Sequence, residues 1–259
     1  MSVRKKNIPI YHCPASEPLM TARLLKHLKI NLLSRNIRRQ EKAINQVLQL
    51  IKDQNNEMIE LFLGSDLPGL LCDVMNNYNP PLIEKVFSCL LKLSRNNQFY
   101  DQKHSAIVID TACRTVLILC KDTATVKTIY CGLQLLYQNL SRADQETAVN
   151  LPLVLRLVRT LVFSPMYQQV HLSAMSVLRL LLRDKKCASD DLFAAVRQTL
   201  MLLSQLNANN KKKFIKNISL AIDIMTGSLR LSNFYKDHDL SHDVSKLALE
   251  LIQSSIVPF

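Results

Sequence analysis

An apolar pattern that recurs about every 44 residues constrains the fold of this 259-residue chain more than any other feature. Five segments align, and their first residues are separated by 43, 43, 45 and 44 positions. A period of about 20 to 50 residues is typical of repeat architectures. The segments are QVLQLIKD at 46–53, CLLKLSRN at 89–96, GLQLLYQN at 132–139, VLRLLLRD at 177–184 and AIDIMTGS at 221–228.

Three columns of this alignment are apolar throughout, and they fall at positions i, i+4 and i+7. That spacing puts them on one stripe of an α-helix. Such a helix cannot bury its stripe alone, so each unit must stack on the next. The columns are Ala43, Val86, Ile129, Ala174 and Ile218; Val47, Leu90, Leu133, Leu178 and Ile222; and Leu50, Leu93, Leu136, Leu181 and Met225.

A second helix is predicted after each aligned segment, following a short polar connection. Pro68 and Pro152 each follow a leucine at the start of such a helix, where a missing N–H has no cost. Ser189, followed by two aspartates, is an N-cap signal with anions at the positive end of the helix dipole. We find no credible strand, so the chain is predicted to be all-α. The second helices are predicted over 67–77, 108–121, 151–164, 190–207 and 241–255.

The units resemble armadillo-type repeats, or the related HEAT repeats, over roughly residues 36–255. The sequence GSDLPGLL at 64–71, followed by the helix over 84–96, carries the resemblance best. It implies an armadillo/HEAT-like right-handed α-solenoid of about five helical repeats, in which the last helix of each repeat lines a binding groove. Residues 17–259 would form the repeat domain, with 17–35 as its N-terminal capping helix and 1–16 as a flexible basic tail.

The same resemblance also limits the function. Importin-α, the best-known armadillo carrier, holds basic cargo with ladders of Trp and Asn, and this chain contains no Trp. A nuclear-import receptor for basic signals is therefore not expected.

Composition and motifs argue against catalysis. The chain has only four glycines, so a dinucleotide-binding fingerprint cannot be formed. Gly64 and Gly69 have Walker A spacing, but leucines stand where Lys and Ser or Thr are needed. His238 and His242 lie in an acidic stretch at helical spacing, yet the Glu of a zinc motif is missing. We predict a non-enzymatic protein with no catalytic residue, cofactor or metal.

Cysteines and hydropathy indicate the compartment. Seven cysteines are scattered singly without a CxxC pair, which is typical of reduced thiols in an intracellular protein. The first residues are polar and basic rather than a secretory signal, and no apolar run reaches the length of a membrane span. We expect a cytoplasmic or nuclear location, or both, and no integral membrane segment.

Four arginines on the predicted second helices form the leading candidate for a partner-binding surface. Arg114, Arg156 and Arg197 are 42 and 41 residues apart, and Arg159 lies one turn beyond Arg156. In a stacked array such positions line up, and forked guanidinium groups suit carboxylates or phosphates. We therefore predict a scaffold that binds a partner protein through an extended or helical segment bearing acidic residues. The alternative is an ordinary solvated face, because Asp73 takes the equivalent place in the first unit.

The uneven charge supports a second hypothesis. The net charge is +12, and residues 1–40 hold nine basic groups against one acidic group, which is +8. These residues and a lysine cluster could make the chain a nucleic-acid- or chromatin-associated factor. Tyr11 is the only aromatic residue in this end, however, so the basic groups are not interleaved with base-stacking aromatics. Solvated surface or attachment to an anionic membrane are the other interpretations. The basic candidates are Arg4, Lys5, Lys6, Arg35, Arg38 and Arg39, and Lys211, Lys212, Lys213 and Lys216.

Overall fold

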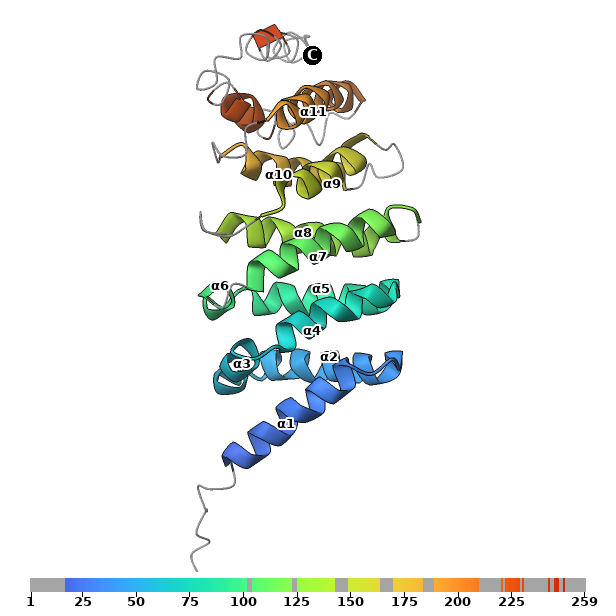
Figure 1. Ribbon diagram of the computed structural model, residues 1–259. Helices are drawn as coiled ribbons and strands as arrows, with labels where there is room; N and C mark the ends of the chain where they lie inside the picture. The colour runs from blue at the N-terminus through green and yellow to red at the C-terminus, as the bar shows by residue number, and fades with distance from the viewer. Residues whose placement is uncertain are drawn as a thin grey trace, which may run out of the picture.

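Paired helices stacked one unit upon the next make up the molecule (Figure 1). This computed structural model describes residues 17–101, 104–122, 125–142, 149–163, 170–183, 189–209, 220, 222–228, 230, 242, 245–246 and 249. Every regular element within these ranges is helical, as the repeat predicts.

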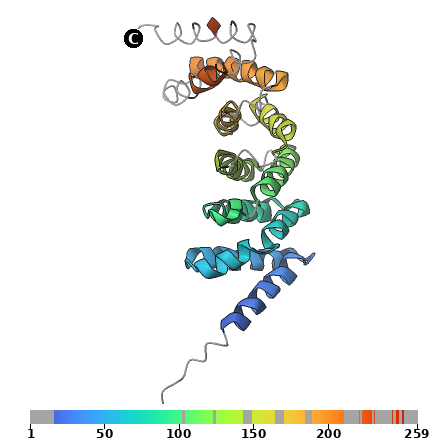
Figure 2. The same ribbon diagram turned by 60° about the vertical axis from the view of Figure 1, so that its left-hand side comes forward.

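The helices form two layers that run side by side along the stack (Figure 2). Helices that are neighbours in one layer also contact each other, so the units form one continuous α-solenoid. One layer consists of α2 (Ile37–Lys52), α5 (Pro80–Leu93), α8 (Val126–Arg142) and α10 (His171–Leu181). The other consists of α1 (Glu17–Leu32), α4 (Leu67–Val74), α7 (His104–Leu119), α9 (Leu151–Phe163) and α11 (Asp190–Asn209).

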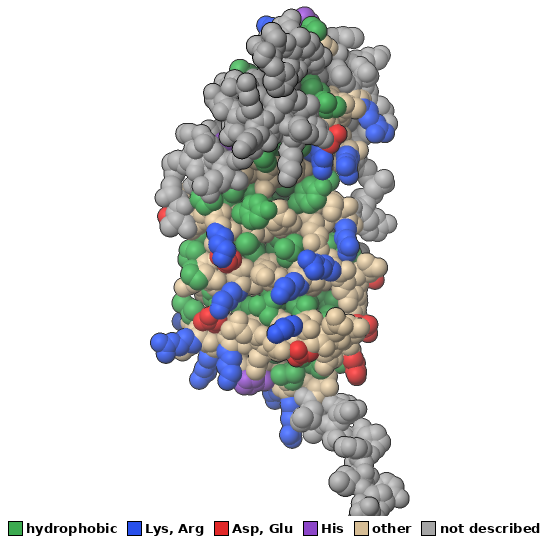
Figure 3. All heavy atoms as spheres, turned by 180° about the vertical axis from the view of Figure 1, so that it is seen from behind, with side chains coloured by type: hydrophobic (Ala, Val, Ile, Leu, Met, Phe, Trp, Pro, Cys, Tyr) green, Lys and Arg blue, Asp and Glu red, His purple; other side chains and the backbone are tan. Residues whose placement is uncertain are grey.

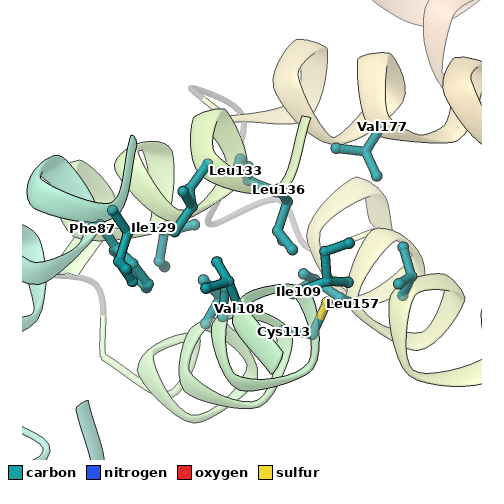
Figure 4. Close-up of a cluster of buried hydrophobic side chains, with 14 of the residues drawn as sticks. Phe87, Val108, Ile109, Cys113, Ile129, Leu133, Leu136, Leu157 and Val177 are labelled. Carbon is teal, nitrogen blue, oxygen red and sulfur yellow. The ribbon is translucent and has the colours of Figure 1, made fainter. Parts of the chain in front are cut away.

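The hydrophobic core is a ribbon that continues from unit to unit between the two layers. One cluster of buried side chains extends from Leu28 in α1 to Ile224 near the other end of the described chain. In its middle, α7 and α8 meet side chains from the units on either side, so these central units share one core (Figure 4). The labelled members are Phe87, Val108, Ile109, Cys113, Ile129, Leu133, Leu136, Leu157 and Val177.

The predicted apolar columns are buried in the units around α5, α8 and α10, and in the fifth aligned segment the prediction is wrong. There Ile222 is 51% exposed, whereas Leu220 and Ile224 are buried. The buried face of this helix is therefore shifted by two residues from the face that the alignment predicted. Contacts with α10 and with Leu182, which follows it, favour that face, because Asp223 pairs with Arg179 and Gly227 lies against Leu182. Ile218 lies outside the described residues.

Two connections contain helices that the sequence pattern did not predict. Between α2 and α4, where a short polar turn was expected, α3 (Asn56–Leu63) buries Met58, Phe62 and Leu63. The Asn55 side chain caps it by accepting a hydrogen bond from the Met58 N–H. The short helix α6 (Gln98–Asp101) precedes α7 and buries Phe99. Each of the first two units thus contains three helices rather than two.

Helix starts follow the predicted signals. Pro68 lies in the first turn of α4 and Pro152 in that of α9. Ser189 accepts a hydrogen bond from the Leu192 N–H at the start of α11. A 3₁₀ turn over Met75–Asn77 extends α4 to the predicted end at Asn77. None of the described helices has the length and apolar character that a membrane span needs.

Candidate interaction surfaces

The four predicted arginines all lie on the layer of α7, α9 and α11. Arg114 is on α7, Arg156 and Arg159 are on α9, and Arg197 is on α11. Arg114 is already paired within its own helix, because its Nε lies 2.7 Å from Oδ2 of Asp110. That hydrogen bond raises the pKa of the Arg114 guanidinium. Arg114 is therefore held along its helix.

Arg156 differs from its neighbours. Nη1 of Arg159 lies 3.2 Å from Oδ1 of Asp191, in the first turn of α11. Arg156 is exposed and makes no ion pair with any described residue. It lines a hollow of about 290 Å³ together with Arg159, Pro152, Leu155, Thr160 and Asp191. A guanidinium beside an apolar floor suits a carboxylate on an apolar segment.

The opposite layer carries ion pairs between neighbouring units that the apolar pattern did not predict. Lys85 pairs with Glu41, Lys127 with Glu84, and Arg179 with Asp223. The partners are 44, 43 and 44 residues apart, which is the repeat period itself. Figure 3 views the molecule from the side of this layer and shows Lys and Arg side chains along it, several of them beside acidic groups. The signal for these ion pairs in the sequence is the occurrence of oppositely charged residues one repeat period apart.

The predicted basic end is only partly within the described residues. Arg35, Arg38 and Arg39 are exposed where α1 meets α2. The backbone N–H groups of Arg38 and Arg39 donate to the side chain of Asn36, which caps α2. No ion pair joins their side chains to another described residue. Arg4, Lys5, Lys6, Lys211, Lys212, Lys213 and Lys216 lie outside the described residues.

The buried cysteines are poor nucleophiles. Burial raises the pKa of Cys72, Cys89 and Cys113 to about 12, so their thiols stay protonated at neutral pH. All five cysteines in the described chain are free. No group of three or more His, Cys, Asp or Glu side chains in that part of the chain could hold a metal. His242 is exposed, and His238 lies outside the described residues.

Comparisons with known proteins relate the chain to one family. A family model described as "Meiosis inhibitor protein 1 N-terminal domain" matches residues 12–189. No curated protein matches the sequence. Among solved structures, the crystal structure of a de novo designed helical repeat protein is similar, with 12% identity and a TM-score of 0.21. That match covers 94% of this chain and 96% of the designed one.

Proposed function

We propose that this chain, which belongs to the Meiosis inhibitor protein 1 N-terminal domain family, acts in meiosis as a scaffold that binds a partner protein. The partner would contribute an extended or helical segment with acidic residues. The family supports the cellular process, and the two long exposed layers of helices support docking over an open surface.

The observation that carries the acidic specificity is the hollow beside Arg156. Its guanidinium is exposed and has no carboxylate partner among the described residues, whereas Arg114 and Arg159 each have one. Pro152 and Leu155 supply apolar surface next to that charge. A carboxylate of the partner would form a charge-assisted ion pair with Arg156, while the partner residues beside that carboxylate cover Pro152 and Leu155.

We further propose an armadillo or HEAT type of repeat, no enzymatic activity, and a cytoplasmic or nuclear location. The extra helices α3 and α6 support the repeat type, because units of about 40 to 47 residues in these families contain two or three helices. The protonated buried thiols and the shallow hollows support docking rather than chemistry.

Peptide selection tests the acidic specificity. A phage-displayed library of random twelve-residue peptides would be selected against the full chain, and enriched sequences measured by fluorescence anisotropy. We expect the selected peptides to be enriched in Asp and Glu. One group of these peptides should lose binding to the Arg156→Glu variant. The matched control is Lys52→Glu, which makes the same charge change at an exposed position on the other layer. Selected peptides without acidic enrichment, or the lack of any peptide group that loses binding in Arg156→Glu, would refute the proposal.

The role in meiosis needs a separate test. Removing the chain from cells that enter meiosis should disturb chromosome behaviour in meiotic spreads and leave mitotic division intact. Normal meiosis in such cells would contradict the proposed process without bearing on the peptide measurements.

The alternative function is association with nucleic acid through the basic end. It is favoured by Arg35, Arg38 and Arg39, whose side chains are exposed and form no ion pair with described residues. Phosphate contacts make binding fall by roughly 0.9 log unit per log unit of salt for each phosphate neutralised on duplex DNA. A duplex that binds with a steep salt slope, and loses that slope when the three arginines become alanine, would support this alternative.

A further inference from the structure

Two hollows on the layer of α5, α8 and α10 join at shared residues. One, of about 480 Å³, lies between the end of α5 and α8, and the other, of about 130 Å³, lies between α8 and α10. Gln134 and Tyr137 on α8 line both. The two hollows therefore form one groove across three successive units, on the layer opposite Arg156.

One end of the groove is basic. Arg95 and Arg142 line the larger hollow, and no acidic side chain lines either one. Arg142 is fixed in place, because its Nη1 donates to the carbonyl oxygens of Ser94 and Arg95 at 3.3 and 3.2 Å. Its guanidinium also lies 5.7 Å from the centre of the Tyr100 ring. Arg95 is exposed and makes no ion pair with a described residue, so its charge is open to a ligand.

The middle of the groove is polar but carries no open charge. Gln134 makes no side-chain hydrogen bond to any described residue, so its amide can donate to and accept from a ligand backbone. The hydroxyl of Tyr137 accepts a hydrogen bond from Nη2 of Arg179 at 3.1 Å. Nη1 of Arg179 in turn pairs with Asp223 at 2.7 Å. That pairing neutralises Arg179, the cation that contacts this part of the groove.

The other end is small. Leu133, Ser173 and Ser176 line the 130 Å³ hollow with Gln134 and Tyr137. The Ser176 hydroxyl donates to the carbonyl of Leu172, within its own helix. A short side chain fits this space better than a long one.

The geometry points to a docking groove for an extended, unmodified peptide segment of a partner protein, with an Asp or Glu at Arg95 and Arg142 and a small residue at Ser173. Neighbouring helices lie about 8 to 10 Å apart, so the groove spans roughly 20 Å across three of them. An extended chain rises about 3.3 Å per residue, which gives a segment of about six residues.

Charge distribution favours a peptide over nucleic acid. A nucleic acid strand needs cations along its whole path, but the open cations gather at one end of this groove. A single carboxylate also matches the hydrogen-bond donors available, because Nη1 of Arg142 already donates to two backbone carbonyl groups. The inference rests on the proposed scaffold role but uses different residues from the Arg156 hollow.

The same peptide selection tests this groove when binding of the selected peptides is measured with a different set of variants. Peptides that bind here should pair an acidic residue with a small residue about four or five positions away. Arg95→Glu and Gln134→Ala should each weaken them about tenfold or more. Arg156→Glu should leave them unchanged, as should Lys42→Glu, which alters an exposed cation on α2 of the same layer. Both groove variants should unfold like the unmodified chain, because neither side chain has a described protein partner.

Three outcomes would overturn the groove. In the first, no selected peptide responds to Arg95→Glu or Gln134→Ala. In the second, a phosphoserine in place of the acidic residue binds more than tenfold better, which would assign the site to a phosphorylated segment. In the third, a single-stranded oligonucleotide displaces the peptide and its binding falls with Arg95→Glu. Loss of binding in Arg156→Glu alone would support the proposed function and refute this groove.

Discussion

Replacing Gly132 with alanine should destabilise the chain even though alanine is the better helix former. Gly132 is buried in α8, and an added Cβ would lie 2.6 Å from Cγ2 of Val116 and 3.0 Å from Cε2 of Phe87. Carbon atoms in contact prefer about 3.5 to 4.0 Å. Val116 and Phe87 are themselves fully buried, so the clash is relieved only by moving α8 away from α5 and α7.

The magnitude follows from two opposing effects. Alanine for glycine inside a helix is favourable by about 1 kcal/mol, whereas overpacking a filled core costs about 1 to 3 kcal/mol. The contact with Val116 is roughly 1 Å too short, which argues for the upper end of that cost. We therefore expect the free energy of unfolding to fall by about 2 kcal/mol, which would lower Tm by roughly 4 to 8 °C.

Gly69 provides the matched control. It also lies in a helix, α4, and a Cβ there would meet no heavy atom within 4 Å. Gly69→Ala should raise the free energy of unfolding by up to about 1 kcal/mol. Urea unfolding followed by far-UV circular dichroism would compare both variants with the unmodified chain. Adding Val116→Ala to Gly132→Ala should recover part of the loss, because it removes the clashing atom. Equal shifts for the two glycine variants would refute the reasoning.

Two further predictions concern pH and the ion pairs between units. Because burial raises the pKa of three thiols to about 12 while unfolded thiols ionise near their ordinary pKa, the stability that they contribute is complete below about pH 8.5 and is lost as pH rises toward 12. Chemical denaturation at pH 8 and pH 10.5 should show this loss, and valine in place of Cys89 should reduce it. For Glu41 and Lys85, which are both partly exposed, a double-mutant cycle should give a coupling of about 1 kcal/mol or less that shrinks in high salt. A salt-independent coupling of several kcal/mol would contradict that assignment.

The sequence predicted the units well because burial imposes a strict helical period on them. Val86, Leu90 and Leu93 fall on one stripe of α5, and all three are buried as expected. The same reasoning failed at Ile222, where an equally apolar pattern allows a neighbouring face to be buried instead. An alignment of apolar residues determines that a helix has a buried side, but the contacts of the adjoining helix determine which side it is.

Short connections were harder to predict for a related reason. The polar residues around Gln54 and Asn55 suggested a turn, and they do end α2, but Met58 and Phe62 then bury a further helix. In eight residues, helical periodicity has too few positions to stand out from the polar ends. The Asn55 cap, followed by Met58 and Phe62 four residues apart, was the only local signal.

A surface site depends on how the residues of neighbouring units line up, and the sequence of a single unit does not determine this. The arginine spacing of about 42 residues correctly put Arg156 and Arg197 on one layer, but spacing alone could not show that Asp191 reaches back to Arg159. Likewise, Gln138 bonds Ser94 across 44 residues, whereas Arg142 reaches the same region across 47 and 48. Both distances bridge one unit, and one helical turn separates them on α8. A sequence search for partners one period apart, widened by a turn in each direction, would therefore find these contacts, but the cations left without such partners become visible only when the helices are stacked.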